Sequence, residues 1–226
     1  VSVGWDRDSN VTYQDDSVHA GVDALYSNDD LNRLIVSDEG TKSGGSITNR
    51  TRKQDWTLTQ TGNWTYDKLD LNGDGDWGDA SEWQDHRTHN DVNELTARDT
   101  DNNGTDNYTL AYDAAGNLTD DGKDYKYVWD AFYRLRLVKN QSNALVAEYK
   151  YNGLNHRLSV HEDTDTDGDV DANDKWYHFA YDVRWRIVAT FREGDSSPKE
   201  QFVYQNAGLG GHGTGSYIDL VAFRDK

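Results

Sequence analysis

Aspartates recur at every second position in the first part of the segment 163–174, whose sequence is DTDTDGDVDAND. Counted from the first residue, positions 1, 3, 5, 9 and 12 are Asp163, Asp165, Asp167, Asp171 and Asp174. Asp169 at position 7 would add a backbone carbonyl, and Gly168 at position 6 allows a sharp turn. Calcium prefers six to eight oxygen ligands at about 2.3 to 2.6 Å. The segment therefore predicts a Ca²⁺-binding loop.

Two further acidic segments repeat part of this pattern. The segment 70–82 offers Asp70, Asn72, Asp74, Asp76, Asp79 and Glu82 as candidate ligands. Its match is less complete, because Ser81 stands at position 12 and Glu82 lies one residue beyond it. The segment 99–107 offers only Asp99, Asp101 and Asn103. For each segment the alternative is a solvated acidic hairpin, for which the composition alone is enough.

The loop at 163–174 resembles the calcium loops of EF-hand and dockerin-type modules. Its carboxylates would repel one another without a cation, and a bound divalent ion would remove that cost and hold the loop in one conformation. Because a ligand that binds only the folded state stabilises it by mass action, we expect Ca²⁺ to stabilise the fold.

Short strands and tight turns position these acidic segments. The sequence YDAAGNL at 112–118 is followed by WDAFYRL at 129–135, so that an aromatic residue and Asp open a turn and Leu begins the next strand. Related turns lie at 28–36, 60–64, 87–96, 151–158 and 181–187. Apolar residues alternate at period 2, and no window shows sustained helical spacing. The sequence predicts an all-β fold of successive antiparallel hairpins.

The predicted strands are most regular in the second half of the chain. They lie at 125–129, 135–139, 145–151, 157–161, 176–181, 185–191 and 201–204. The step from Tyr151 to Tyr181 is longer than the step from Trp129 to Tyr151. An insertion that contains the acidic segment 163–174 explains this excess.

The two ends of the chain and one internal segment are less regular. We expect only weak strands in 1–27 and a polar, Gly-rich loop at 37–53. A Gly-rich arm at 207–216 precedes a last strand at 217–224. The length is that of one all-β domain, so we predict a single domain over 1–226.

Composition restricts the partners of the chain. A formal net charge of −18 argues against binding to nucleic acid or anionic membranes and favours cations. The chain has no apolar run long enough to insert into a membrane, and Cys and Met are both absent, which fits an extracellular location. Because it begins at Val1 without a signal-like segment, we expect a processed form or an excised fragment. Glycans could be attached at the sequons of Asn10, Asn49, Asn63, Asn103, Asn107, Asn117 and Asn140.

The turn copies resemble YD repeats, the building unit of bacterial RHS proteins and related cell-surface proteins. Three segments carry the resemblance most specifically: YDAAGNLT at 112–119, RTHNDVNELT at 87–96 and YIDLVAFRD at 217–225. With the intervening copies it covers residues 28–225. The resemblance implies a β-sheet strip wound into a spiral, which in large members closes into a shell around a toxin. Large members process themselves near an Asp-Pro motif, and this chain has no Asp-Pro dipeptide.

These observations predict a non-catalytic, extracellular or cell-surface building block, because no motif selects a catalytic pair among the many acidic residues. A strip this short has open edge strands, so we expect copies of the chain to pair edge to edge into an oligomer or filament. One alternative is a segment of an RHS-type toxin-encasing shell. Another is a carbohydrate-binding adhesin with a tryptophan platform formed by Trp56, Trp64, Trp77, Trp83, Trp129, Trp176 and Trp185.

Overall fold

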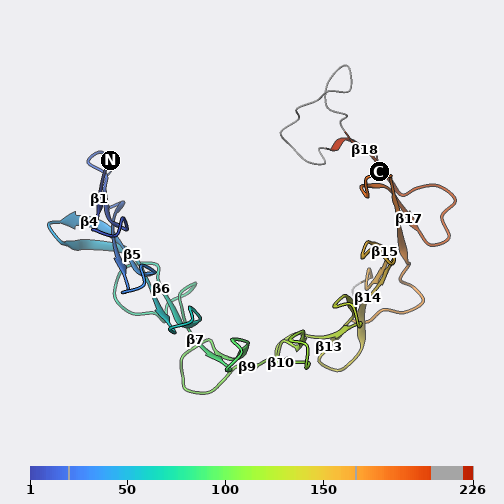
Figure 1. Cartoon of the computed structure of the whole chain (residues 1–226), viewed down its shortest axis with the longest axis horizontal. Helices are drawn as coiled ribbons and strands as arrows, with labels where there is room; N and C mark the ends of the chain where they lie inside the picture. The colour runs from blue at the N-terminus through green and yellow to red at the C-terminus, as the bar shows by residue number, and fades with distance from the viewer. Residues whose placement is uncertain (20, 166, 205–220, 226) are drawn as a thin grey trace. The chain divides into compact units, whose positions relative to one another are not determined.

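A computed structural model of the chain describes residues 1–19, 21–165, 167–204 and 221–225 (Figure 1). The described residues form strands and no helix, which confirms the prediction of an all-β fold. The strands are β1 (Ser2–Trp5), β2 (Val11–Asp15), β3 (Asp23–Asn28), β4 (Leu34–Ser43), β5 (Ser46–Leu58), β6 (Trp64–Asp70), β7 (Trp83–His89), β8 (Leu95–Asp99), β9 (Tyr108–Thr109), β10 (Ala111–Tyr112), β11 (Leu118–Asp120), β12 (Tyr125–Trp129), β13 (Leu135–Asn140), β14 (Leu145–Tyr151), β15 (Arg157–Glu162), β16 (Tyr177–Tyr181), β17 (Ile187–Arg192), β18 (Glu200–Tyr204) and β19 (Val221–Asp225).

The chain separates into two units, and we describe each by itself. The first unit, Val1–Ala111, holds a nine-stranded sheet of β1 to β9. The second unit, Tyr112–Lys226, holds a ten-stranded sheet of β10 to β19. In both sheets every strand pairs antiparallel with the next strand along the chain. The single domain over 1–226 stays a prediction.

The turn that begins at Asp113 shows why the Tyr-Asp sequence recurs. The Asp113 carboxylate accepts hydrogen bonds from the backbone N–H groups of Ala115, at 2.9 Å, and Asn117, at 3.0 Å. Hydrogen bonds from the Asn117 side chain and these N–H groups lower the pKa of Asp113. Gly116, three residues after Asp113, adopts φ 82°, which glycine reaches without steric cost. An Asp, Asn or Thr side chain caps the same kind of turn at Asp6, Asp29, Thr59, Asn90, Asp130, Asn152 and Asp182.

The aromatic residue before the turn ties neighbouring strands together in the second unit. The Tyr151 hydroxyl donates to the Leu135 carbonyl at 2.9 Å, and the Tyr204 hydroxyl donates to the Ile187 carbonyl at 2.8 Å. The Trp129 ring N–H fills the same role, with the Leu118 carbonyl as its acceptor at 2.7 Å. In each case the acceptor is the first residue of the preceding strand. The Tyr or Trp therefore links strands, while the Asp caps the turn.

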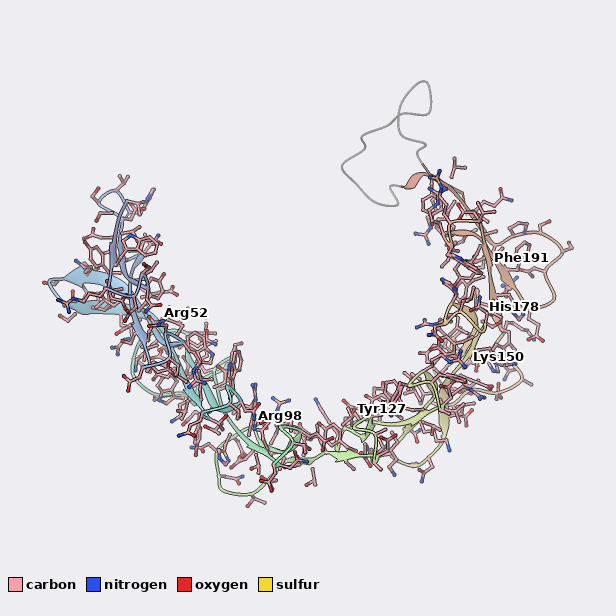
Figure 2. All side chains as sticks on the ribbon, in the orientation of Figure 1. Arg52, Arg98, Tyr127, Lys150, His178 and Phe191 are labelled. Atoms are coloured by element: carbon pink, nitrogen blue, oxygen red, sulfur yellow. The ribbon has the colours of Figure 1, made fainter. Side chains whose placement is uncertain are left out.

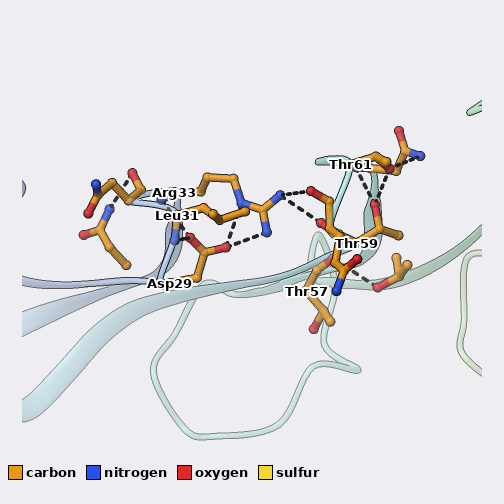
Figure 3. Close-up of polar contacts among 11 residues, drawn as sticks. Asp29, Leu31, Arg33, Thr57, Thr59 and Thr61 are labelled. Carbon is orange, nitrogen blue, oxygen red and sulfur yellow. Dashed lines mark hydrogen bonds and ion pairs between the residues drawn. The ribbon is translucent and has the colours of Figure 1, made fainter.

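Arginine side chains connect successive turns along the same edge of a sheet (Figure 3). The Arg33 guanidinium binds the Asp29 carboxylate of its own turn and donates to the Thr59 carbonyl of the next turn at 2.8 Å. Arg134 does the same with Asp130 and with the Asn152 carbonyl, at 2.9 Å. In each case an ion pair holds the arginine within its own turn, and a hydrogen bond from the same side chain connects that turn to its neighbour.

Buried side chains are few, and they differ between the units. In the second unit the most buried apolar residues are Val138, Ala147, Val160 and Ala189. In the first unit Ala24, Leu69 and Ala97 are buried beside the carboxylates of Asp23, Asp67, Asp70, Asp85 and Asp99. The first unit therefore depends more on paired charges inside its sheet.

The structure corrects the prediction of a loop at 37–53. Those residues belong to β4 and β5, a long hairpin that turns at Gly44 and Gly45 after the pair Ser43 and Ser46. The strands have a polar sequence because ion pairs line them, such as Arg50 with Asp38 at 2.6 Å. Polarity that is typical of a loop here reflects a hairpin with cross-strand charge pairs.

Two predictions at the ends of the chain need separate comment. The region 1–27 is more regular than predicted, because Trp5 and Asp6 open a further turn of the repeat. At the other end, the described part of the predicted strand 217–224 lies in β19, and residues 217–220 lie outside the described residues. The Gly-rich arm at 207–216 lies outside the described residues.

Candidate metal-binding loops

All three acidic loops connect strands on the side of the sheet opposite the Tyr-Asp turns. Because consecutive strands are antiparallel neighbours, successive connections alternate between the two edges. The Tyr-Asp turns lie at one end of the strands, and the connections β6–β7, β8–β9 and β15–β16 lie at the other end. The predicted insertion after β15 is therefore a loop at the end of the strands that carries no Tyr-Asp turn.

The three loops share one hydrogen bond that encloses their first turn. The leading aspartate accepts from the backbone N–H of the glycine five residues later. The pairs are Asp70 with Gly75 at 3.1 Å, Asp99 with Gly104 at 2.8 Å and Asp163 with Gly168 at 3.0 Å. These glycines have φ values of 91°, 85° and 108°. The glycine predicted for a sharp turn therefore has the same role in all three loops.

The loop after β15 brings carboxylates into two groups. Oxygen atoms of Asp163, Asp165 and Asp174 lie within 4.8 Å of one another, and so do those of Asp167, Asp169 and Asp171. All six residues were predicted ligands, but the structure divides them into two sets rather than one. The Asp169 carboxylate joins the second set, where the sequence predicted only its backbone carbonyl.

Asp174 closes this loop and is nearly fully buried. It accepts hydrogen bonds from the Thr164 N–H at 2.6 Å, the Thr164 hydroxyl at 2.8 Å and the Asp171 N–H at 3.1 Å. The hydrogen bonds from Thr164 are the largest cause of the lowered pKa of Asp174, which is about 2. Burial and the neighbouring charges of Asp167, Asp174 and Asp163 instead raise the pKa of Asp165.

Aromatic side chains pack beside Asp174. The Trp176 ring stacks on His161, with centroids 4.8 Å apart, and the Lys150 ammonium lies 3.6 Å from the centre of the Trp176 ring. A nitrogen of His161 is 3.2 Å from the Asp174 carbonyl. Lys150 and His178, the other neighbours of the Trp176 ring, are labelled in Figure 2. From the sequence, Trp176 was expected in a strand and in the tryptophan platform of the adhesin alternative, and its stacking on His161 beside the loop was not predicted.

The loop after β6 is anchored on a buried carboxylate. Asp70 is fully buried and accepts from the N–H groups of Gly73, at 2.5 Å, and Gly75. Gly73 is required here, because a Cβ at this position would lie 2.2 Å from the Arg50 carbonyl of β5. The packing of this loop against β5 was not predicted from the sequence.

The remaining predicted ligands of this loop contact one another. The Asn72 amide donates to Asp79 at 2.8 Å and to Asp74 at 3.2 Å, and Asp76 accepts from the Gly78 N–H. Glu82, one residue beyond position 12, accepts from the Leu71 N–H at 2.8 Å. Glu82 therefore closes the loop where Asp174 closes the loop after β15, despite its shifted position.

The loop after β8 is the shortest of the three. Asp99 is buried; burial acts to raise its pKa, but hydrogen bonds from Gly104, Asp101 and Asn103 together lower it. The Asn103 amide donates to the Asp101 carboxylate at 2.9 Å. Asn107, which was not predicted as a site residue, accepts from both the N–H and the hydroxyl of Thr100.

The EF-hand part of the resemblance is not supported by the surroundings of the loops. An EF-hand loop lies between two helices, whereas β15 and β16 flank the loop at 163–174. Part of this loop also contacts the sheet edge: the Val170 N–H donates to the Leu145 carbonyl at 2.7 Å. What the loop shares with calcium loops is the spacing of its carboxylates and its glycine.

Most of the sequon amides already take part in hydrogen bonds within the chain. Asn10, Asn63, Asn103, Asn117 and Asn140 donate their side-chain N–H groups to neighbouring residues. Asn49, in contrast, is exposed on β5. None of the described residues forms a helix long and apolar enough to cross a membrane.

No family model matches the chain, and neither does any curated protein. Among solved structures, it is similar to the crystal structure of TcdB2-TccC3 without its hypervariable C-terminal region. That match has a TM-score of 0.50 and 14% identity, and covers 88% of this chain but 12% of the other. The Tc holotoxin pore of Photorhabdus luminescens matches with a TM-score of 0.47 and 13% identity, over 87% of this chain and 13% of the other. The first match shows a shared fold, in agreement with the resemblance to YD-repeat proteins.

Proposed function

We propose that this chain is a non-catalytic, extracellular building block that Ca²⁺ stabilises and that assembles with copies of itself by strand addition. The observation that carries the proposal is the unbranched strand order of both sheets. Strands β1 and β19 each have only one partner among the described strands. An unpaired strand edge is a template for another strand. Each sheet has two terminal strands, β1 and β9 in the first unit and β10 and β19 in the second, and the proposal uses β1 and β19.

The donor set of the loop at 163–174 fits Ca²⁺. Its side-chain donors are carboxylate oxygens, which suit a hard cation. Oxygens that lie within 4.8 Å of one another, as those of Asp163, Asp165 and Asp174 do, can share one ion at about 2.4 Å from each. Bound Ca²⁺ would supply positive charge among carboxylates that now face one another. Asp163 and Asp174 would also hold the loop closed through the bonds that they already accept from Gly168 and Thr164.

A terbium experiment tests the metal proposal. Tb³⁺ has ligand preferences like those of Ca²⁺, and the indole of Trp176 next to Asp174 would sensitise its luminescence. We expect luminescence that Ca²⁺ displaces, and a higher melting temperature in Ca²⁺ than in EDTA. Asp165→Asn should weaken binding, whereas Asp91→Asn, with the same loss of charge in an exposed turn, should not. Equal melts in EDTA and millimolar Ca²⁺ would contradict the proposal.

The comparisons favour one second candidate. The chain spans only 12% of the TcdB2-TccC3 chain whose fold it shares. It could therefore serve as one segment of a larger RHS-type shell, with β1 and β19 paired to further strands of the same polypeptide. Sedimentation of the purified chain distinguishes the two candidates, because a shell segment is expected to stay monomeric and a building block to polymerise.

Charge and composition support the other parts of the proposal. The net charge of −18 disfavours nucleic acid and anionic membranes, and the absence of Cys and Met suits an oxidising exterior. Asn49 is one exposed sequon at which a glycan can be attached. Mass spectrometry of the native protein tests for glycosylation at this position.

A further inference from the structure

Strand β1 ends with an aromatic hydrogen-bond donor, Trp5, for which the described residues contain no preceding strand to supply the acceptor. We call such an aromatic residue a repeat donor. Trp5 ends β1 and precedes the Asp6 turn, the position that Trp129 and Tyr151 occupy in later hairpins. Those two residues donate to the first residue of the preceding strand. The Trp5 side chain is 63% exposed and forms no hydrogen bond among the described residues. The position of Trp5 therefore points to a strand that would pair with the free edge of β1.

Strand β19 carries, at its first residue, the backbone carbonyl position that accepts such a hydrogen bond in other strands. Strand β19 begins at Val221, which pairs with Tyr204 across a β-bulge, as Leu135 pairs with Trp129. In the second unit, the carbonyls at the starts of β13 and β17 accept a hydrogen bond from the aromatic residue that ends the following strand. Among the described strands none follows β19, so the Val221 carbonyl is in the acceptor position without a repeat donor.

Strand pairs of this kind follow one register throughout the chain. The residue two positions after the start of one strand pairs with the residue three positions before the end of the next. The pairs are Tyr13 with Leu25, Val36 with Asp55, Tyr66 with His86, Ala97 with Thr109 (with Tyr112 taken as the strand end), Asp120 with Lys126, Leu137 with Glu148, Ser159 with His178 and Ala189 with Gln201. A new pair that continues these interfaces is expected to adopt the same register.

We propose that β1 of one copy pairs antiparallel with β19 of a second copy, so that the Trp5 ring N–H donates to the Val221 carbonyl. The register places Ser2 opposite Phe223. This inference rests on the proposed self-assembly and specifies its two surfaces. Because the surfaces differ, the contact is heterologous and adds copies into a ring or an open filament rather than a dimer with two identical surfaces in contact.

An apolar hollow beside β1 gives independent support. Val3, Trp5, Val11, Tyr26 and Leu34 are among the residues that line it. Val3 and Leu34 are exposed to 42% and 41%, respectively. The lining residues come from β1 to β4, so the hollow lies over the first four strands of the sheet. Exposed apolar surface is typical of an interaction site, and a strand added to β1 would extend the sheet beside this hollow.

Cysteine cross-linking tests the register directly, because the chain has no native Cys. Ser2→Cys and Phe223→Cys are made in separate, differently tagged copies, which are mixed and then oxidised. Directly opposed residues of antiparallel strands have Cα atoms about 4.5 to 5.5 Å apart, within reach of a disulfide. We expect a mixed disulfide dimer from this pair and a much lower yield when Ala222→Cys replaces Phe223→Cys.

A second variant tests the role of the indole. Trp5→Phe keeps an aromatic ring but removes the N–H donor, and we expect it to raise the critical concentration for assembly roughly fivefold. Trp83→Phe, in an interior strand, serves as the control. If the wild type polymerises but the two cross-links form equally or not at all, the register is wrong while self-assembly stands. If the wild type does not polymerise, both proposals fail.

Discussion

One strand pair in each unit fills the same position of the repeat with opposite chemistry. In the second unit, Val138 pairs with Ala147, and both are buried. The equivalent pair in the first unit is Asp67 with Asp85, and both carboxylates are buried. The strand register is the same in the two units. The comparison teaches that the turns set the register, so that the strand interiors are free to hold either apolar or charged pairs.

Two arginines make the charged version possible. Like charges directly opposite one another destabilise a sheet unless they are compensated. Arg87 lies 2.6 Å from Asp85 and 3.7 Å from Asp67, and Arg98, labelled in Figure 2, binds Asp85 through two of its nitrogens. The Gln54 amide also donates to Asp67. The β6–β7 pair thus depends on charges that the β13–β14 pair does not need.

The largest effect is expected from removing one of these arginines. Arg87→Met should lower the free energy of unfolding of the first unit by about 3 kcal/mol, because it leaves buried carboxylates with fewer partners. Arg136→Met in the second unit is the matched control, since Arg136 is half exposed and 3.9 Å from Glu148. Hydrogen exchange, which reports each unit separately, measures both. Equal losses in the two variants would contradict the difference between the units.

The aromatic position comes next in size. Tyr151→Phe removes the hydroxyl that donates to Leu135 and should cost about 1 kcal/mol. Tyr133→Phe is the control, because Tyr133 is 65% exposed. Chemical denaturation followed by tryptophan fluorescence measures the change. If the two variants behave alike, the hydroxyl does not tie the strands.

A substitution at His89 can introduce into the first unit the aromatic hydrogen bond between strands that is seen in the second unit. This residue holds the aromatic position of its repeat, and its Nδ1 is buried without a hydrogen-bond partner among the described residues. His89→Tyr should add a bond to the Trp64 carbonyl, the first residue of the preceding strand, and stabilise the unit by somewhat less than 1 kcal/mol. Loss of stability would show that the rule of the second unit does not extend to the first.

The same variant tests the pH response. Burial and the nearby Arg87 lower the pKa of His89 below 6.5. Below that pH the unfolded chain takes up a proton that the folded chain resists, so stability should fall as the pH drops from 7.5 to 5.5. His89→Tyr should reduce this fall. Unfolding midpoints at the two pH values, compared with those of the wild type, provide the measurement.

The smallest effect is expected in the turns. Tyr133 and Trp185 both hold left-handed conformations, with φ of 59° and 62°. Tyr133→Gly should stabilise the turn by about 0.5 kcal/mol, because glycine adopts this φ without strain. Trp185→Gly should not, because it removes a ring that stacks on His156 at 4.0 Å. Thermal melts of the two variants should shift in opposite directions.

The turns and the β class could be predicted from the sequence, because the Asp, Asn or Gly at fixed offsets has a direct local cause. The register could not, although it follows from the turns once the strand ends are known. The hairpin of β4 and β5 was missed because its strands carry charged residues whose partners lie across the hairpin. A pattern of local polarity does not reveal partners that are distant in sequence.

For the acidic loops too, local features could be predicted from the sequence and contacts with distant residues could not. Spacing identified Asp163 and Gly168, which form the predicted turn. It did not indicate the burial of Asp70 against β5, the closing role of Glu82, or the contact between Asp174 and His161. These depend on which strands flank each loop, and that information lies outside the loop sequence.

We propose that copies of the chain assemble through the terminal strands β1 and β19. Sedimentation velocity of the purified chain in millimolar Ca²⁺, with electron microscopy of the sedimented material, tests this assembly. We expect regular polymers whose average length grows with protein concentration. A single monomeric species at all concentrations would contradict it.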